Sequence, residues 1–357
     1  MKIMTIIGTR PELIRLSLVI PLLDENCKHC FVHTGQNYDP DLNAIFFKEL
    51  GVRKPDYMLD CARKNLAATV GAVLMECEKV IERERPDRVL ILGDTNSALA
   101  AIIAKRKGIP VYHMEAGNRC FDDRVPEEVN RRLVDHVSEI LLPYTERSRA
   151  NLLREGIPSQ RIFVTGNPIL EVIKHYQDGA KNSNILSELG IAKSGYFLAT
   201  LHRSENIDVA GILSNVLKTL DRLSKEYEIP VVFSVHPHAR EKLRKGKISA
   251  GKNIIMSRPF GFFDFISLSS NARCVLSDSG TVPEECAIMN VPCVILRETT
   301  ERPEMLEAGS SLLAGTEATA ILRGLKLVLA TPPRWTPPAE YLAENVSEKV
   351  ARIILGV

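Results

Sequence analysis

The sequence predicts an α/β protein built from two doubly wound parallel sheets, and the spacing of its apolar runs carries that prediction. Short, continuous apolar runs alternate with amphipathic helical stretches along the whole chain. Continuous apolar strands separated by helices are typical of parallel sheets whose two faces are both covered. The 357 residues are too many for one ordinary core and suit two domains of about 150–180 residues each.

The expected strands fall into two sets, one in each half of the chain. They are Lys2–Ile7, Cys30–Thr34, Arg88–Leu92, Pro110–Met114 and Ile140–Pro143, then Tyr196–Thr200, Pro230–Ser234, Ala272–Ser277 and Pro292–Leu296. The halves also echo each other, because each contains a strand, an aspartate, a short turn, a helix and an X-Pro entry to the next strand. Any two βαβ units share this pattern, so the echo adds little.

Turn-rich and polar segments set the expected domain boundaries. We place an N-terminal Rossmann-like domain at residues 1–170, a C-terminal one at 171–338 and a final helix at 339–357. Gly166–Pro168 closes the first half, and the polar stretch Gln177–Ser187 is typical of a linker with a short helix. A proline-rich hinge precedes the last helical stretch, which we expect to cross back to the first domain.

Composition excludes several classes of protein. A net charge of +2 argues against a nucleic-acid-binding or membrane-binding surface. No apolar run approaches the roughly 18–20 residues of a membrane span. Met1–Gly8 breaks at once into polar residues, so we interpret it as a first strand rather than an export signal, and expect a cytoplasmic protein.

Neither a metal site nor a redox cofactor is predicted. Most of the eight cysteines lie in apolar runs, where free cysteine behaves as a small hydrophobic residue. Cys27 and Cys30 form a lone C-x-x-C with no second pair to complete a zinc site. The chain contains no G-x-G-x-x-G, so a bound nicotinamide is not indicated.

The segment Val275–Cys286 is the most informative part of the chain. An apolar run ends in Asp278, turns at Gly280 and enters a helix that carries Glu284 and Glu285. Such a turn can bring backbone N–H groups close to a phosphate, and a carboxylate in the helix can accept hydrogen bonds from sugar hydroxyls. A sugar nucleotide needs both features. The alternative is an ordinary strand-to-helix turn capped by Asp278 or Ser279.

Charged residues follow several other predicted strands, where open α/β sheets bind ligands. Arg10 follows the first strand and suits a diphosphate, and Arg15 lies one helical turn later. Asp94 and Glu115 follow two further strands and are expected at one edge of the sheet. Alternation turns His113 the other way, so we interpret it as structural.

Pro126 opens a helix that is rich in charged residues. Glu127 and Arg131 are four residues apart and therefore share a face. Functional and structural interpretations of Glu127 are both open. We interpret Glu128 and Arg132 as a first-turn acid and a surface salt bridge.

The second half places two histidines at strand ends. His202 and Arg203 follow the strand that ends at Thr200, and His236 follows the strand that ends at Ser234. A lone histidine is usually structural, but two at strand ends are more often ligand contacts.

Motifs along nearly the whole chain resemble the UDP-N-acetylglucosamine 2-epimerase family. They are Gly8–Glu12, Gly93–Thr95, His113–Gly117, Pro126–Arg132, Asp278–Gly280 with Glu284 and Glu285, and Thr299–Glu304. The resemblance implies a two-domain GT-B fold with the active site in the cleft between the domains, a homodimer, no cofactor, and a role in making surface polysaccharide precursors.

The resemblance also implies a mechanism and a set of roles. UDP is eliminated from a UDP-acetamido sugar to leave a glycal and is then added back with C2 inverted. By similarity, Asp94, Glu115 and Glu127 form the acid/base set, with Arg131 beside them and His202 on the diphosphate. The remaining implied substrate contacts are Arg10, Arg15, Arg203, His236, Ser279, Gly280, Thr281, Glu285 and Arg302.

Four departures from the best-known branch of this family favour a modified sugar as substrate. Arg15 replaces a lysine, Thr281 replaces a glycine, the loop Asn118–Val125 is shorter, and Thr34–Leu42 replaces a segment that helps to bind an activating second substrate molecule. We therefore expect a tailored UDP-acetamido sugar and no activation by substrate. Arg119 or Arg124 could form a basic pocket for a uronate, although either could equally face solvent.

Three alternatives stay open at this point. A hydrolysing 2-epimerase would release UDP and a free sugar. A GT-B glycosyltransferase would need an acceptor site and would not need three acidic groups around C2. A nucleotide-sugar sensor would bind without turnover.

Overall fold

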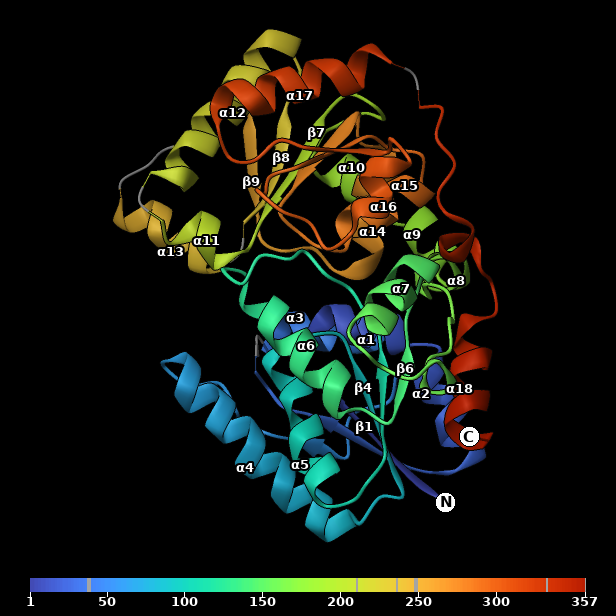
Figure 1. The fold of residues 1–357 in the computed structure, drawn as a ribbon. Helices are drawn as coiled ribbons and strands as arrows, with labels where there is room; N and C mark the ends of the chain where they lie inside the picture. The colour runs from blue at the N-terminus through green and yellow to red at the C-terminus, as the bar shows by residue number, and fades with distance from the viewer. Residues whose placement is uncertain (37–39, 210, 236, 247–249, 332, 357) are drawn as a thin grey trace. The chain divides into compact units, whose positions relative to one another are not determined.

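The computed structural model describes residues 1–36, 40–209, 211–235, 237–246, 250–331 and 333–356. The chain forms two compact units (Figure 1). Unit 1 comprises Met1–Lys174 together with Ala339–Val357, and unit 2 comprises His175–Pro338. Each unit is built on one six-stranded sheet. All of the strand pairs within both sheets are parallel.

The sheet of unit 1 has the strand order β3-β2-β1-β4-β5-β6. Its strands are β1 (Lys2–Ile7), β2 (Lys28–His33), β3 (Tyr57–Met58), β4 (Arg88–Leu92), β5 (Val111–Met114) and β6 (Ile140–Leu142). This is the order of a doubly wound dinucleotide-binding sheet, in which the chain reverses direction across the sheet between β1 and β4. Ligands bind at the carboxyl ends of the strands in such sheets, which is where the candidate residues lie.

Helices cover both faces of this sheet. They are α1 (Arg10–Leu16), α2 (Val19–Asn26), α3 (Pro40–Glu49), α4 (Leu66–Glu84), η1 (Asn96–Leu99), α5 (Ala100–Arg106), α6 (Pro126–Val137), α7 (Glu146–Arg154), η2 (Ser159–Arg161) and α8 (Ile169–His175). α4, η1, α5 and α6 pack in one apolar cluster with alternate residues of β1, β2 and β4. Asn65 caps α4 by accepting from the Ala68 N–H at 2.9 Å.

The C-terminal segment belongs to unit 1. It contains η3 (Ala339–Leu342) and α18 (Val346–Gly356), and α18 packs against α2 (Figure 1). Ser347 N donates to the Glu171 carboxylate at 2.9 Å, and the Arg88 guanidinium donates to the Ile354 carbonyl. These bonds join α18 to two distant parts of the same unit.

Unit 2 repeats the architecture with the strand order β12-β11-β10-β7-β8-β9. Its strands are β7 (Phe197–Leu201), β8 (Val231–Val235), β9 (Ile254–Ser257), β10 (Cys274–Ser277), β11 (Cys293–Ile295) and β12 (Ser311–Leu313). Phe197 and Ala199 enter one apolar cluster, while Tyr196 and Leu198 enter another. This alternation places one core on each face of the sheet.

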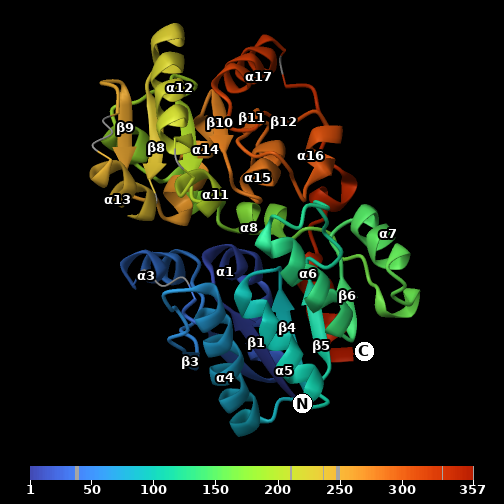
Figure 2. The ribbon, with the colours of Figure 1, turned by 60° about the vertical axis from the view of Figure 1, so that its left-hand side comes forward.

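Most helices of unit 2 pack in one of those two cores (Figure 2). The helices of this unit are α9 (Gln177–Lys181), α10 (Ile185–Glu188), α11 (Ser204–Ile207), α12 (Ile212–Tyr227), α13 (Pro237–Lys245), α14 (Phe262–Asn271), α15 (Val282–Ile288), α16 (Pro303–Glu307) and α17 (Ala318–Ala330). α12 and α17 pack in one core, and α10, α14 and α15 pack in the other.

Every strand predicted from the sequence is present, with shifts of a few residues at the ends. The predicted set was incomplete, because β3, β9 and β12 were missed. Each of them is an edge strand. β6, the fourth edge strand, has three apolar, buried residues and was predicted, whereas β3, β9 and β12 have at most one buried residue each. No helix within the described part of the chain is long and apolar enough to cross a membrane.

Candidate active site

Two carboxylates of unit 1 lie at the carboxyl ends of neighbouring strands. Leu92 of β4 pairs with Met114 of β5, so Asp94 and Glu115 leave the sheet side by side. Glu115 Oε2 lies 3.9 Å from the point where a Cβ on Gly93 would stand. Glu115 has a φ of 65°, which strains the backbone of a non-glycine residue. The structure thus brings together two of the predicted acid/base residues.

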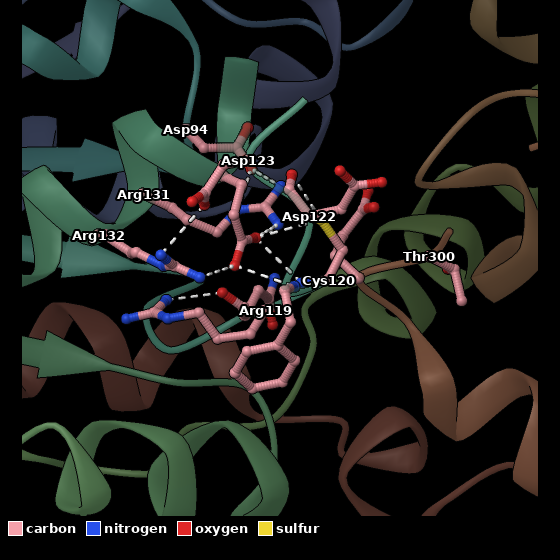
Figure 3. A network of polar contacts seen from close by, with 12 residues as sticks. Asp94, Arg119, Cys120, Asp122, Asp123, Arg131, Arg132 and Thr300 are labelled. Atoms are coloured by element: carbon pink, nitrogen blue, oxygen red, sulfur yellow. Dashed lines mark hydrogen bonds and ion pairs between the residues drawn. The ribbon is translucent and has the colours of Figure 1, made fainter. Parts of the chain in front are cut away.

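Arg131 of α6 holds Asp94 through a forked contact (Figure 3). Its Nε and Nη2 donate to Asp94 Oδ2 at 2.9 and 2.5 Å. The Arg131 side chain is 2% exposed and that of Asp94 is 20% exposed. Charge-assisted bonds of this geometry are among the strongest in proteins. Asp94 is therefore fixed in orientation while it stays accessible to a ligand.

Glu127 lies in the first turn of α6, four residues before Arg131, and is partly exposed. The interpretation of its neighbour Glu128 as a surface residue is wrong. Glu128 is fully buried, because the preceding loop folds over its carboxylate. Arg132, its partner at 3.1 Å, is half-exposed.

Arg119, one of the two arginines considered for a uronate, is paired within the protein. Its side chain is fully buried and donates to Glu155 at 2.7 and 2.6 Å, with Asp135 at 2.8 Å. Arg124 is 82% exposed and pairs with Asp122. His113 is also buried, and contacts Asp135 and the Gly93 carbonyl, both at 2.8 Å. Arg119 and His113 thus both pair with the buried Asp135 carboxylate.

The motif Gly8–Glu12 forms a tight turn around one buried carboxylate. Glu12 accepts from Gly8 N and Thr9 N at 2.7 and 2.6 Å and from Thr95 Oγ1 at 2.8 Å. The turn after β1 is thereby tied to the turn that carries Asp94. Arg10 is partly exposed above the Phe46 ring, whereas Arg15 is 1% exposed.

Glu12 is expected to make the stability of the protein depend on pH. Burial raises the pKa of Glu12 from 4.5 to about 7, against the opposing hydrogen bonds from Gly8, Thr95 and Thr9. The folded state therefore binds this proton more tightly than the unfolded state. The stabilisation that the bound proton gives the folded state is complete below about pH 4.5. It is lost as the pH rises to about 7, where the free energy of unfolding is lower by roughly 3 kcal/mol.

Urea unfolding of wild type and Glu12→Gln at several pH values measures this loss. The difference between the two proteins is the readout, because His33, whose pKa burial lowers to about 4, acts in the opposite direction. If the free energy of unfolding varies with pH in the same way for both proteins, Glu12 does not cause the pH dependence.

Unit 2 contains a histidine–aspartate pair at the ends of β7 and β10. His202 Nδ1 lies 2.9 Å from Asp278 Oδ1, with side-chain exposures of 46% and 0%. Asp278 also accepts from Arg203 N and from Asn206 Nδ2, each at 3.0 Å. Burial alone raises the pKa of Asp278, but the His202 charge and these bonds lower it overall. Asp278 is thus an ionised group that orients His202.

Gly280 lies against a buried ion network. A Cβ on Gly280 would stand 2.2 Å from Glu301 Oε1. Glu301 is in turn held by Arg297 at 2.8 Å and lies 3.7 Å from Arg203 Nη2. Arg203 Nε donates to the Asp278 carbonyl at 3.0 Å. A methyl group at Gly280 would therefore require the Glu301 carboxylate to shift.

Gly280→Ala is expected to lower the free energy of unfolding by about 1–3 kcal/mol, because the methyl group must displace Glu301 from its ion pairs. Urea unfolding measures the effect. Gly71→Ala in α4 is the matched control, since nothing beyond the adjacent backbone of its own helix lies within 4 Å of the added Cβ. Gly71→Ala should leave stability unchanged or raise it slightly. Equal stabilities of the two variants would show that the Glu301 side chain moves aside at no cost in free energy.

The remaining predicted residues of unit 2 cluster around α15. Ser279 Oγ accepts from Thr281 N at 3.2 Å in the turn before the helix. Glu285 is 4% exposed, and Arg302 is 2% exposed with its Nε on the buried Glu284 carboxylate. His236 lies outside the described residues, as do residues 37–39 of the segment Thr34–Leu42.

A family model described as UDP-N-acetylglucosamine 2-epimerase matches residues 23–355. The chain belongs to this family. It is 41% identical to a UDP-N-acetylglucosamine 2-epimerase of Methanococcus maripaludis, over 99% of this chain and 98% of the relative. It is 37% identical to a UDP-2,3-diacetamido-2,3-dideoxy-D-glucuronate 2-epimerase of Pseudomonas aeruginosa, over 92% of each chain.

The fold agrees with solved structures of UDP-N-acetylglucosamine 2-epimerases. The Methanocaldococcus jannaschii enzyme in complex with UDP-GlcNAc and UDP superposes with a TM-score of 0.94 at 38% identity, over 99% of both chains. Two doubly wound units of this kind constitute the GT-B fold, and the named relatives are isomerases.

The sequence did not identify the residues that hold the predicted site residues of this 2-epimerase in place. Asp278 was considered as a helix cap and as part of a family motif, and Glu12 only as part of such a motif. Glu128 was interpreted as the acid of a surface salt bridge, and Asp135 was given no role. The partners of Asp135 and Asp278 are distant in sequence, so those contacts follow only from the fold. Glu128 contacts residues three to eight positions away, and its burial follows from the loop that precedes α6.

Proposed function

We propose that this chain inverts C2 of a UDP-2-acetamido sugar by eliminating UDP to a glycal and adding it back. The observation that carries the proposal is the pair of carboxylates, Asp94 and Glu115, at neighbouring strand ends with Arg131 clamped onto Asp94. A C2 inversion needs positioned groups that take a proton from one face and return it to the other.

The chemistry explains why no oxidant is needed. A proton on C2 beside an acetamido group is not acidic enough to be removed directly. When the C1–oxygen bond breaks, UDP leaves with the bonding electrons, the C2 proton passes to a carboxylate, and C1=C2 forms. In the return step, C2 gains a proton on its other face and a UDP oxygen attacks C1. Charge develops on the diphosphate, so groups that bind it contribute to catalysis.

We assign the two parts of this reaction to the two units. Asp94, Glu115 and Glu127 of unit 1 form the acid/base set. His202, held by Asp278, faces the diphosphate together with the turn Ser279–Thr281. Glu285 meets the ribose hydroxyls, and the other proposed substrate contacts are Arg10, Arg15, Arg203, His236 and Arg302.

The proposed substrates are UDP-2-acetamido hexoses. The relatives' names supply two members of this class, UDP-N-acetylglucosamine and UDP-2,3-diacetamido-2,3-dideoxy-D-glucuronate. The burial of Arg119 removes one of the two arginines considered for a sugar carboxylate. The proposal also includes a homodimer and a cytoplasmic location, both of which rest on the family resemblance.

Incubation of the enzyme in D2O with a panel of these sugars tests the proposal. We expect proton NMR to show loss of the C2 proton signal together with formation of the C2 epimer. Turnover without deuterium at C2 would exclude the mechanism. Phosphorus NMR in the same tubes separates the alternatives, because free UDP that accumulates in step with turnover indicates a hydrolysing enzyme.

We expect the rate to depend hyperbolically on substrate concentration. Thr34–Leu42 replaces the segment that, in the branch activated by substrate, helps to bind a second UDP-N-acetylglucosamine. Initial rates over a wide range of UDP-N-acetylglucosamine concentrations measure this. A strongly sigmoidal curve would contradict the expectation.

A further inference from the structure

Glu128 is a buried carboxylate that the proposed reaction does not use. It is 0% exposed and lies in the first turn of α6. Its oxygens accept from Arg131 Nη1 at 2.7 Å, Arg132 Nη2 at 3.1 Å and Cys120 N at 3.0 Å. Burial alone raises the pKa of Glu128, but the Cys120 bond and the Arg131 charge lower it overall, so it is ionised.

The first group of contacts connects Glu128 to Asp94. The guanidinium of Arg131, which Figure 3 labels together with Asp94, uses Nη1 for Glu128 and the Nε–Nη2 edge for Asp94. A planar guanidinium held on two edges cannot rotate about its own axis. The orientation of Asp94 thus depends on Glu128 through one rigid group.

The second group of contacts connects Glu128 to Glu115. Cys120 N and Phe121 N donate to the two oxygens of Glu128 at 3.0 and 3.1 Å. The same loop carries Asn118, whose Nδ2 donates to Glu115 Oε1 at 3.3 Å. Phe121 has a φ of 55°, a conformation that costs free energy unless its surroundings hold it. The hydrogen bond from Phe121 N to the Glu128 carboxylate helps to stabilise this conformation.

We propose that Glu128 is a positioning residue that aligns both proposed acid/base carboxylates, Asp94 through Arg131 and Glu115 through the loop Asn118–Val125. This inference rests on the proposed function. Glu128 itself does not touch the sugar, because the loop and α6 enclose it.

Glu128→Gln keeps the shape of the side chain and removes its charge and one acceptor oxygen. We expect kcat to fall by about 10- to 100-fold, as a small misplacement of reacting groups does. The KM and the dissociation constant of UDP should stay within about threefold, because the proposed nucleotide contacts of unit 2 are untouched. A purely structural role would change stability and UDP binding together instead.

Arg132→Gln is the matched control. Arg132 also contacts Glu128, but it is half-exposed and pairs on its other side with the exposed Asp123 at 3.1 Å. Its loss should leave kcat within about twofold, because exposed ion pairs contribute little. A loss of kcat equal to that of Glu128→Gln would overturn the proposed route through Arg131 and the loop.

A double-mutant cycle tests the route directly. In an Arg131→Lys background, the fork that links Glu128 to Asp94 is already broken, so Glu128→Gln should cost clearly less kcat than it costs in wild type. Additive losses would overturn the coupling. Deuterium exchange at C2 can follow the slow variants.

The outcomes separate this inference from the proposed function. Wild-type protein that never exchanges C2 with solvent refutes the proposed function. Active wild type with an equally active, folded Glu128→Gln refutes the inference. If Glu128→Gln does not fold, Glu128→Asp, which keeps the charge but withdraws it by one methylene, must show the same loss of kcat. Failure of both variants to fold assigns Glu128 to stability and also refutes the inference.

Discussion

Asp94→Asn is expected to reduce both C2 inversion and C2 deuterium exchange by about a thousandfold, the scale of an acid/base group in a reaction of this kind. The amide keeps the volume of the carboxylate and can still accept from Arg131. It cannot take a proton from carbon or hold a full charge against the guanidinium. Rates of deuterium entry at C2, measured by NMR, report the effect.

UDP binding should survive this substitution, since the proposed nucleotide contacts lie mostly in unit 2. Titration calorimetry with UDP checks that expectation. Asp60→Asn is a suitable control, because the side chain of Asp60 is 91% exposed in the same unit. Activity of Asp94→Asn within tenfold of wild type would remove Asp94 from the acid/base set.

Arg302→Met is expected to destabilise unit 2 by about 3–5 kcal/mol, because it takes the guanidinium away from a buried carboxylate. Arg302 is 2% exposed, and Glu284, which it contacts, is 0% exposed. Glu284 lies in α15 and Arg302 caps the start of α16, so the pair also joins two helices.

The double variant Glu284→Met with Arg302→Met should recover much of that loss, since two apolar side chains leave no buried charge. Urea unfolding of both single variants and the double variant gives the coupling free energy. Additive losses would show that the two groups do not depend on each other. UDP binding by folded Arg302→Lys separates this structural pairing from the nucleotide contact that the family resemblance implies.

Central strands and their ends could be predicted from sequence because both depend on local pattern. A continuous apolar run that stops at a polar residue, as at Asp94, Glu115 and Asp278, marks a strand end whether or not the partner strands are known. β9 was missed although it begins with three apolar residues, since so short an apolar run does not distinguish a strand from a helix segment.

Burial of charged side chains could not be predicted in the same way. Glu128 was interpreted as a surface residue because its helical position alone suggests exposure, and only the loop Asn118–Val125 covers it. Arg119 was considered for a ligand because its actual partners, Asp135 and Glu155, are distant in sequence and could not be recognised from it. Contacts made through the fold decide whether such a charge meets solvent, a ligand or another side chain.

The central claim is that breaking the C1–oxygen bond to UDP makes the C2 proton removable. Positional isotope exchange tests it most directly, with substrate that carries oxygen-18 in the bridge between C1 and the β-phosphorus. We predict that the label scrambles into the non-bridging positions of the β-phosphate at a rate comparable with inversion, and that UDP and a glycal appear in quenched reactions. Complete inversion at C2 with the bridging oxygen retained and no glycal formed would contradict the account.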